Sequence, residues 1–440
     1  MSSSKKVSAA PAPYVQQTLN FLDSLFGSYP RSDFAFRLWE GTIWQKANAE
    51  AARFTIVLNH PAALRRMFLP PSDTRLANAY MLADFDIEGE AGGALNLGQH
   101  LWQSWRWRDL IRSGVQLVML PSNASATDVS PQFSGTVHSA DRDKRAIQYH
   151  YDVSNEFYKL WLDERMVYSC AYFKSASDTI EDAQVQKLDH ICKKLRLQKG
   201  ERILDIGCGW GALVIHAVKH YGVTALGVTL SEKQVELARK RVQAAGVSES
   251  CEIELLDYRA IDESKEFDKI VSVGMVEHVG RSNLKVYFEK AYRLLRPGGV
   301  FLNHGITLLH DKFTTERQMK NGFFAKYIFP DGDIQPLTYI LKVATSETKF
   351  EIRDVESLRE HYAMTLKCWQ ERLEKHEEQV VDMMGSRSYR LWRLYLLAAG
   401  WGFANGLHSI YQTLLYKAYE EGGSVRTEES LPLTRADWYE

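Results

Sequence analysis

Between residues 200 and 309 the chain alternates short apolar runs with segments in which apolar residues recur at helical spacing. The apolar runs predict β-strands at 201–206, 223–230, 251–256, 267–273 and 299–309. The periodic segments predict helices at 212–221, 231–246 and 283–295, the second with Ser231 as its N-cap and Gly246 at its end. Strands that alternate with helices are typical of right-handed crossovers and a parallel sheet, so we expect an α/β domain here.

Nearer the C-terminus the pattern predicts a helix at 387–404 and a strand at 409–418. Pro, Ser, Gly, Asn and Asp dominate residues 121–142, where apolar periodicity disappears, so this stretch is expected to be a linker. The sequence thus predicts an N-terminal α/β module at 1–122, a linker at 123–142 and a second domain at 143–440.

Within the N-terminal module the pattern predicts a strand at 53–59 and a helix at 62–68. Residues 79–90 carry apolar and acidic side chains toward a turn. Residues 99–119 combine helical spacing with interleaved tryptophans and arginines: Trp102, Trp105, Trp107, Arg106, Arg108 and Arg112. Two interpretations of 99–119 stay open, an ordinary packed helix or an amphipathic helix that rests on anionic lipid.

Composition narrows the class of protein without identifying it. The 440 residues are 45% hydrophobic and 25% charged, which excludes global disorder. The formal net charge is -1, which removes the general electrostatic argument for a nucleic-acid partner. Five cysteines without paired spacing argue against a disulfide framework and against a zinc or other metal site.

The chain shows no apolar core of a signal peptide near residue 1, and its longest apolar stretch, 394–404, is short for a membrane span. We therefore expect a cytoplasmic protein that associates peripherally with the inner face of the membrane.

The segment DIGCGWG, residues 205–211, follows a predicted strand and precedes a predicted helix. Glycines let the backbone approach a ligand, and the helix N-terminus offers free N–H groups. The segment is not a phosphate-binding P-loop, which requires G-K-[ST], and it fits the dinucleotide fingerprint poorly because the third glycine is missing. A tight turn without a ligand remains the alternative. An acid before G-x-G at this place resembles the S-adenosylmethionine-dependent methyltransferases of the Rossmann-like type.

That resemblance implies a set of cofactor contacts. Gly207 and Gly209 are expected to lie against the methionyl part. Thr229 and Gln234 offer hydroxyl and amide groups to the ribose where most relatives have an acid. Asp257 is expected near the adenine, although it could instead cap a loop. The other residues assigned to the cofactor by the resemblance are Tyr168, Ser169, Asp205, Leu230, Tyr258 and Gly274.

A second block, residues 150–173, is dense in aromatic and charged residues that no simple period explains. Together with DIGCGWG, GVTLSEKQ, SVGMVEHVG and KYIFPDG, in that order, it resembles the cyclopropane fatty acid synthases over about residues 145–420. The resemblance implies a Rossmann-like class I methyltransferase domain with a mostly parallel seven-stranded sheet, preceded by a small α/β domain. It also implies a homodimer on a phospholipid membrane surface.

Enzymes of this family transfer the methyl of S-adenosylmethionine to the double bond of a phospholipid acyl chain. An alkene needs no base for the attack, so the site must align the methyl with the double bond in a dry pocket. Aromatic faces stabilise the resulting cation by about 0.5–2 kcal/mol each. One proton then leaves to close the ring, and in the family a bound bicarbonate accepts it.

The resemblance assigns the bicarbonate cluster to five residues. Glu277 and His304 are expected to orient bicarbonate, Ile306 to offer its backbone, and Tyr362 to donate a hydroxyl. Cys170 is expected to act through its backbone and position, not as a nucleophile. Without the motifs, Cys170 would be a small buried hydrophobe and His304 a core histidine, whereas a buried carboxylate such as Glu277 is costly without a role.

The chain departs from the family pattern at two positions. Ser154 stands where many members have glycine, which concerns local turn geometry, and Val276 stands where a bulkier aromatic is common, which would widen the pocket near the acyl chain.

Residues 314–342, within a segment at about 311–345, are expected to form a lid over the acyl pocket; a packed helical insertion is the alternative. Its aromatic and basic residues would line the channel and face phosphates: Phe323, Phe324, Tyr327, Phe329, Lys320 and Lys326. The predicted reaction forms cyclopropane rings at cis double bonds of unsaturated phospholipids. Two alternatives stay open: a sister enzyme that makes methyl-branched or methylene acyl chains, and a non-catalytic lipid-binding protein.

Overall fold

The computed structural model describes residues 14–27, 29–46, 49–104, 114–122, 139, 141–143, 145–146, 154–309, 322–419 and 434–439, with only the backbone at 102–104. The chain divides into two compact units: Met1–Ser130 with Met384–Ala398, and Pro131–Met383 with Ala399–Glu440. The predicted linker at 123–142 falls almost wholly outside the described residues, so that boundary stays a prediction. Within the described ranges no helix is long and apolar enough to cross a membrane.

The first unit is built on a sheet of four described strands in the order β2-β1-β3-β4, in which β1 and β3 run parallel. Its elements are α1 (Val15–Phe26), β1 (Phe34–Arg37), β2 (Ile43–Trp44), β3 (Phe54–Leu58), α2 (Ala63–Phe68), α3 (Asp73–Met81), β4 (Phe85–Gly89) and α4 (Ala91–Ser104). The predicted strand at 53–59 and helix at 62–68 are confirmed by β3 and α2. Strand β4 was overlooked, although Phe85 and Ile87 alternate with Asp86 and Glu88 as strand residues do.

Residues from far along the chain complete the first unit. Arg390 donates to the backbone oxygens of Tyr80 and Phe85 and to the carboxylate of Asp86. Its guanidinium also lies 4.2 Å from the centre of the Tyr80 ring. These contacts explain why Met384–Ala398 belongs to the first unit, which the sequence pattern did not predict.

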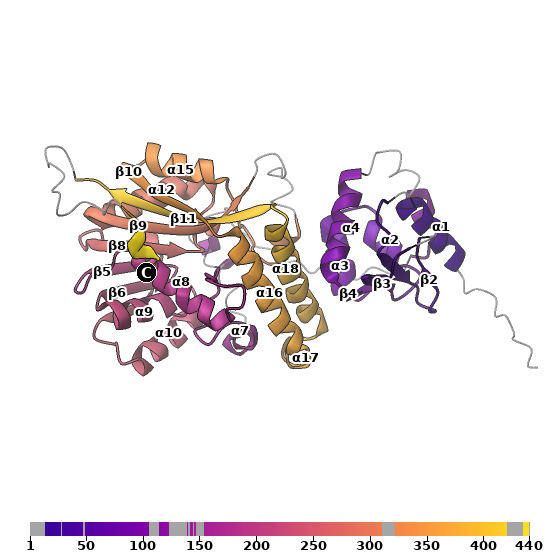
Figure 1. Ribbon diagram of the computed structural model, residues 1–440, viewed down its shortest axis with the longest axis horizontal. Coiled ribbons are helices and arrows are strands. Elements are labelled where there is room, and N and C mark those ends of the chain that lie inside the picture. Colours follow the sequence, from indigo (N-terminus) through magenta and orange to yellow (C-terminus); the bar gives the residue numbers. More distant parts are fainter. Residues whose placement is uncertain are drawn as a thin grey trace, which may run out of the picture. The chain divides into compact units, whose positions relative to one another are not determined.

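The second unit contains the predicted α/β domain. Its described strands form one seven-stranded sheet in the order β10-β11-β9-β8-β5-β6-β7, in which β11 pairs antiparallel with β9 and β10, and the other pairs are parallel (Figure 1). The Rossmann-like fold with a mostly parallel seven-stranded sheet is therefore confirmed.

The elements of the second half of the chain follow in order. They are α7 (Asn155–Trp161), α8 (Ile180–Lys194), β5 (Arg202–Ile206), α9 (Ala212–Tyr221), β6 (Thr224–Thr229), α10 (Glu232–Ala244), β7 (Cys251–Leu255), η1 (Tyr258–Ala260), β8 (Phe267–Val273), α11 (Val276–Val279), η2 (Arg281–Asn283), α12 (Leu284–Leu294), β9 (Leu295–Leu308), α14 (Phe323–Tyr327), α15 (Leu337–Ser346), β10 (Phe350–Ser357), α16 (Arg359–Lys375), α17 (Glu377–Met384), α18 (Ser386–Ala404), β11 (His408–Lys417) and η3 (Ala436–Trp438). Each strand and helix predicted between residues 200 and 309 is present, and so are the predicted helix at 387–404 and strand at 409–418.

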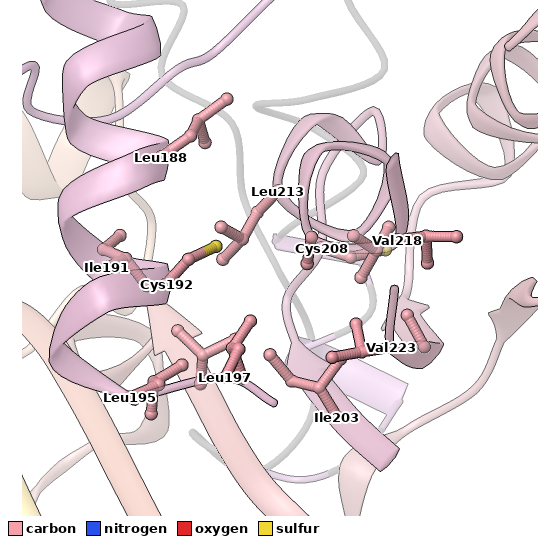
Figure 2. Close-up of a cluster of buried hydrophobic side chains, with 14 of the residues drawn as sticks. Leu188, Ile191, Cys192, Leu195, Leu197, Ile203, Cys208, Leu213, Val218 and Val223 are labelled. Carbon is pink, nitrogen blue, oxygen red and sulfur yellow. The ribbon is translucent and has the colours of Figure 1, made fainter. Parts of the chain in front are cut away.

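Helices cover both faces of this sheet. Helices α8, α9 and α10 lie on one face, and α12 and α15 lie on the other (Figure 1). In Figure 2, Cys192 of α8 points toward Leu213 of α9, with Ile203 of β5 below them. This packing leaves the carboxyl edge of the parallel strands as the place where loops can build a site.

Candidate active site

A cavity lies at the carboxyl ends of β5, β6 and β8, where α/β proteins bind their ligands. Ten of the eleven predicted cofactor residues line it: Tyr168, Ser169, Asp205, Gly207, Gly209, Thr229, Leu230, Gln234, Tyr258 and Gly274. These ten residues come from five separate segments of the chain.

The eleventh residue, Asp257, does not line the cavity. It caps η1, and its carboxylate accepts hydrogen bonds from the backbone N–H, Nε and Nη2 of Arg259 at 2.6–2.9 Å. This geometry agrees with the loop-capping alternative, and a cofactor contact by Asp257 stays a prediction.

The glycine loop has the backbone shape that its sequence requires. Gly207 and Gly209 have φ values of 86° and 55°, a region that favours glycine. Asp205, the acid before the loop, is buried, and its Oδ1 has no hydrogen-bond partner among the described residues. Burial raises the pKa of the Asp205 carboxyl to about 7, and nearby Lys187 opposes that rise.

Lys187 is a cavity residue that sequence reasoning missed. It is 2% exposed, and its Nζ lies 3.0 Å from the Ser169 Oγ. Burial lowers its pKa to about 8, and the charges of Asp163 and Asp205 oppose that fall. A signal was present, because position 187 falls on the helical series of buried positions 180, 183, 184, 187, 188 and 191 in α8.

Among the residues expected to contact the ribose, the Thr229 hydroxyl donates to Gln234 Oε1 over 2.7 Å, and both side chains are buried. Ser231 caps α10 by accepting from the Gln234 backbone N–H, as the sequence predicted. The two residues proposed to replace the usual ribose acid are thus held together by the start of α10.

The predicted catalytic residues lie around β9 and α16 and do not line this cavity. Strand β8 ends at Val273, so the Ile306 N–H on the next strand has no strand partner on that side. Glu277 takes this place, with its Oε1 accepting from the Ile306 N–H over 2.6 Å. Glu277 Oε2 has no partner among the described residues, and burial raises the pKa of the carboxyl to about 7.

Gly305 makes this approach possible. A Cβ at Gly305 would lie 2.2 Å from Val276 Cγ1 and 3.8 Å from Glu277 Oε1. Val276, the departure from the family pattern, is buried against this glycine and is not among the residues that line the cavity. The other departure, Ser154, accepts from the Phe157 N–H and caps α7.

His304 is fully buried on β9. Burial lowers its pKa to about 3, so the imidazole is neutral at physiological pH. Its Nδ1 lies 3.3 Å from Gln412 Nε2, whereas its Nε2 has no partner among the described residues.

Cys170 and Tyr362 meet at one backbone carbonyl. The Cys170 Sγ lies 3.7 Å from the Leu358 oxygen, which also accepts from the Tyr362 N–H. Leu358 in turn donates its N–H to Ile410, whose register partner on β9 is Ile306. Burial raises the pKa of the Cys170 thiol far above its ordinary value, which agrees with a positional role.

The second half of the expected lid is anchored beside Glu277. The Asp333 N–H donates to the Glu277 backbone oxygen, and Arg142 pairs with Asp331 at 2.6 and 2.8 Å. In α14, Phe323 and Tyr327 are buried. The ring of Phe329 lies 5.8 Å from that of His278, a residue that lines the cavity.

Several predicted residues fall outside the described part of the structure. These are Trp105, Trp107, Arg106, Arg108, Arg112 and Lys320, and for Trp102 only the backbone is described. Their proposed contacts with lipid stay predictions.

A family model described as "Mycolic acid cyclopropane synthetase" matches residues 138–413, which is more than half of the chain. The chain belongs to the mycolic acid cyclopropane synthetase family. The resemblance to cyclopropane synthases is thereby confirmed. As a member of the mycolic acid cyclopropane synthetase family, the protein is an S-adenosylmethionine-dependent methyltransferase.

Relatives match nearly the whole chain. A "Probable fatty acid methyltransferase" of Pseudomonas putida is 37% identical over 92% of this chain and 95% of its own length. The "Cyclopropane-fatty-acyl-phospholipid synthase" of Escherichia coli is 32% identical over 86% of this chain and 94% of its own. The similarity therefore extends beyond the methyltransferase domain into the N-terminal unit.

Two solved structures of cyclopropane synthases are similar to about two thirds of this chain. The cyclopropane synthase MmaA2 of Mycobacterium tuberculosis matches with a TM-score of 0.59 and 31% identity, over 66% of this chain and 99% of that one. The mycolic acid cyclopropane synthase CmaA1, in complex with S-adenosylhomocysteine (SAH) and CTAB, matches with a TM-score of 0.58 and 33% identity. The match covers 62% of this chain and 97% of that one. A bound SAH in that relative agrees with the use of S-adenosylmethionine by this chain.

Proposed function

We propose that this enzyme adds a methylene bridge to the cis double bond of unsaturated phospholipid acyl chains, with bicarbonate as the proton acceptor. The observation that carries the proposal is a pair of buried polar atoms, Glu277 Oε2 and His304 Nε2, without partners among the described residues. Buried polar groups are nearly always hydrogen-bonded, so two such atoms indicate a polar ligand. The name of the Escherichia coli relative supports the same substrate class.

The electrostatics of the two residues suit an anion. His304 is neutral, so it offers a ring N–H without adding a second cation to a site where the acyl chain becomes positively charged. Glu277 has a pKa of about 7, so part of the population carries a proton that it can donate to an anion oxygen. Bound S-adenosylmethionine supplies the electrophilic methyl, and bound bicarbonate supplies the proton acceptor.

The acyl chain undergoes two bond-forming steps. One alkene carbon bonds to the methyl as the carbon–sulfur bond breaks, which leaves positive charge on the chain. The new methyl then loses one proton, and the electron pair of that C–H bond closes the ring. Glu277 and His304 serve the second step by holding the acceptor.

Aromatic rings surround the cofactor cavity on one side. The Tyr168 ring, which lines the cavity, lies 5.3–5.5 Å from the rings of Tyr158, Trp161 and Trp369. The Tyr168 ring at the cavity can stabilise positive charge by about 0.5–2 kcal/mol, and the three rings behind it exclude water. They supply the dry surroundings that attack by an alkene requires.

We also propose that the protein acts as a homodimer, peripherally attached to the inner face of the membrane from the cytoplasm. Three apolar side chains at the end of the tryptophan- and arginine-rich segment 99–119 support the attachment: Val115, Val118 and Met119 are 57–64% exposed. Exposed apolar residues beside basic ones are typical of surfaces that bind anionic lipid.

A second candidate function starts from the same cation. The Pseudomonas putida relative is named a fatty acid methyltransferase, which favours a methyl-branched or methylene product. The two candidates share the cofactor cavity. They differ in whether the cation on the methylated acyl chain loses its proton to close a ring or forms a methyl-branched or methylene chain.

The test is methyl transfer to vesicles of unsaturated phospholipid, with methyl-labelled S-adenosylmethionine, varied bicarbonate and NMR of the recovered acyl chains. We expect cyclopropane signals and a rate that rises with bicarbonate, and we expect Glu277→Gln to lose the rate while it still binds SAH. Methyl-branched chains would favour the second candidate, and no labelled lipid at any bicarbonate concentration would refute both.

A further inference from the structure

The strand pairing of the second unit places a glutamine directly beside the proposed anion site. In the register between β9 and β11, Gln412 is the partner of His304, so the two side chains project from the same face of the sheet. Both are fully buried. Gln412 Nε2 lies 3.3 Å from His304 Nδ1, and Gln412 Oε1 has no partner among the described residues.

Hydrogen-bond chemistry then decides where the imidazole proton lies. An amide nitrogen only donates, so the His304 Nδ1 that faces it must accept. A neutral imidazole carries one proton, which therefore sits on Nε2. Nε2 is the ring atom left without a partner, so His304 presents an N–H donor to whatever fills the site.

The reverse orientation of the amide is less favourable. If Gln412 turned its oxygen toward Nδ1, its NH₂ group would occupy the position that has no partner among the described residues. Buried N–H groups without partners are rarer than buried carbonyl oxygens without partners. His304 Nε2 would then carry a lone pair toward an anion, which repels it.

We propose that Gln412 is a positioning residue that holds His304 as the Nε2–H tautomer, so that the imidazole donates to the bound bicarbonate. This inference rests on the proposed function, because the bound bicarbonate is the group that accepts from the His304 Nε2–H. Gln412 itself touches neither the cofactor cavity nor the reacting carbon atoms; it acts through the histidine ring.

The first experiment reads the tautomer without any turnover. The full-length enzyme is labelled with ¹⁵N-histidine, and the His304 signals are assigned by their loss in a His304→Asn variant. We expect a protonated Nε2 and an Nδ1 that accepts a hydrogen bond. In Gln412→Met, which keeps a similar volume and removes the donor, the Nδ1 resonance should move to the position of a nitrogen without a hydrogen bond.

The second experiment measures the bicarbonate dependence of methyl transfer. We expect Gln412→Met to raise the half-saturating bicarbonate concentration about tenfold, with that for S-adenosylmethionine unchanged. Thr413→Val is the matched control, because Thr413 is the next residue on the same strand and its hydroxyl bonds to the Asn303 oxygen. It should leave both the His304 spectrum and the bicarbonate dependence as in the wild type.

The outcomes separate this inference from the proposed function. A wild-type His304 protonated at Nδ1, or an Nδ1 resonance that does not move in a folded Gln412→Met variant, would overturn the role of Gln412 and leave the proposed function standing. A bicarbonate dependence equal in Gln412→Met and wild type would also overturn it. Failure of the wild type to methylate lipid would refute the proposed function and with it the donation to bicarbonate, whereas the ¹⁵N spectrum would still show whether Gln412 holds the His304 tautomer.

Discussion

Replacing Gly305 with alanine puts a methyl group where Val276 already lies. The added Cβ would be 2.2 Å from Val276 Cγ1, whereas carbon atoms in contact lie about 3.5–4.0 Å apart. The strand and α11 must therefore separate by about 1.3 Å, or Val276 must leave its rotamer. The expected cost in the free energy of unfolding is about 1–3 kcal/mol.

The same displacement reaches Glu277, the next residue after Val276. The Glu277 Oε1 to Ile306 N distance of 2.6 Å would grow beyond the usual hydrogen-bond range of about 2.7–3.2 Å. Because a displacement of about 1 Å in a positioned group can lower a rate about 100-fold, we expect a loss of that order in methyl transfer by Gly305→Ala. SAH affinity should fall much less than the rate, because neither Gly305 nor Val276 lines the cofactor cavity, although the neighbouring Met275 and His278 do.

A second substitution makes the reasoning refutable. Val276→Ala removes Cγ1 and leaves Val276 Cβ at 3.5 Å, an ordinary contact, so the Gly305→Ala and Val276→Ala double variant should recover much of the lost rate. The assay is labelled methyl transfer with a bicarbonate titration, beside urea unfolding and SAH binding. A fully active Gly305→Ala variant, or a folded double variant no better than the single one, would contradict the steric account.

Three further predictions test the other buried groups. Burial raises the pKa of Glu277 from 4.5 to about 7, so the native state holds this proton more tightly than the unfolded state does. Urea unfolding should therefore show that the wild type, relative to Glu277→Gln, loses stability as the pH rises from about 4.5 to about 7. The expected loss is up to about 3 kcal/mol. Lys187→Met should weaken SAH binding about tenfold by calorimetry, because Ser169 loses its partner, while Lys240→Met on the exposed face of α10 should not. Cys170→Ala should keep methyl transfer within about tenfold of wild type, since the burial that raises its pKa keeps the thiol protonated; complete loss in a folded variant would indicate a nucleophile.

The parts of the fold that the sequence predicts are those with one clear period. Strands β5 to β9 and their helices follow from apolar runs and helical spacing. Strand β10 was missed because five of the eight residues in FEIRDVES are polar or charged, as suits an edge strand with one exposed face. Position on the sheet edge, not local propensity, selects those residues.

Some residues of the candidate site could likewise be predicted from the sequence, and others could not. Residues next to a strand end or a glycine turn, such as Asp205 and Glu277, could be found because their place along the chain indicates their place on the sheet edge. Gln412 and Lys187 could not be assigned, because their partners depend on which strands and helices lie side by side. The local sequence signal for Gln412 and Lys187 is that a polar residue stands at a position where the hydrophobic periodicity predicts a buried side chain.

The membership of Met384–Ala398 in the first unit bears on how the chain folds during synthesis. Tyr80, Phe85 and Asp86 leave the ribosome roughly three hundred residues before Arg390, their partner. Until Arg390 is synthesised, the oxygens of Tyr80, Phe85 and Asp86 that it binds have to be solvated by water. The first unit therefore lacks this part of its structure while most of the methyltransferase domain is translated. Such a late closing contact spans a long stretch of chain, which slows folding, and it makes the N-terminal unit dependent on a nearly full-length polypeptide.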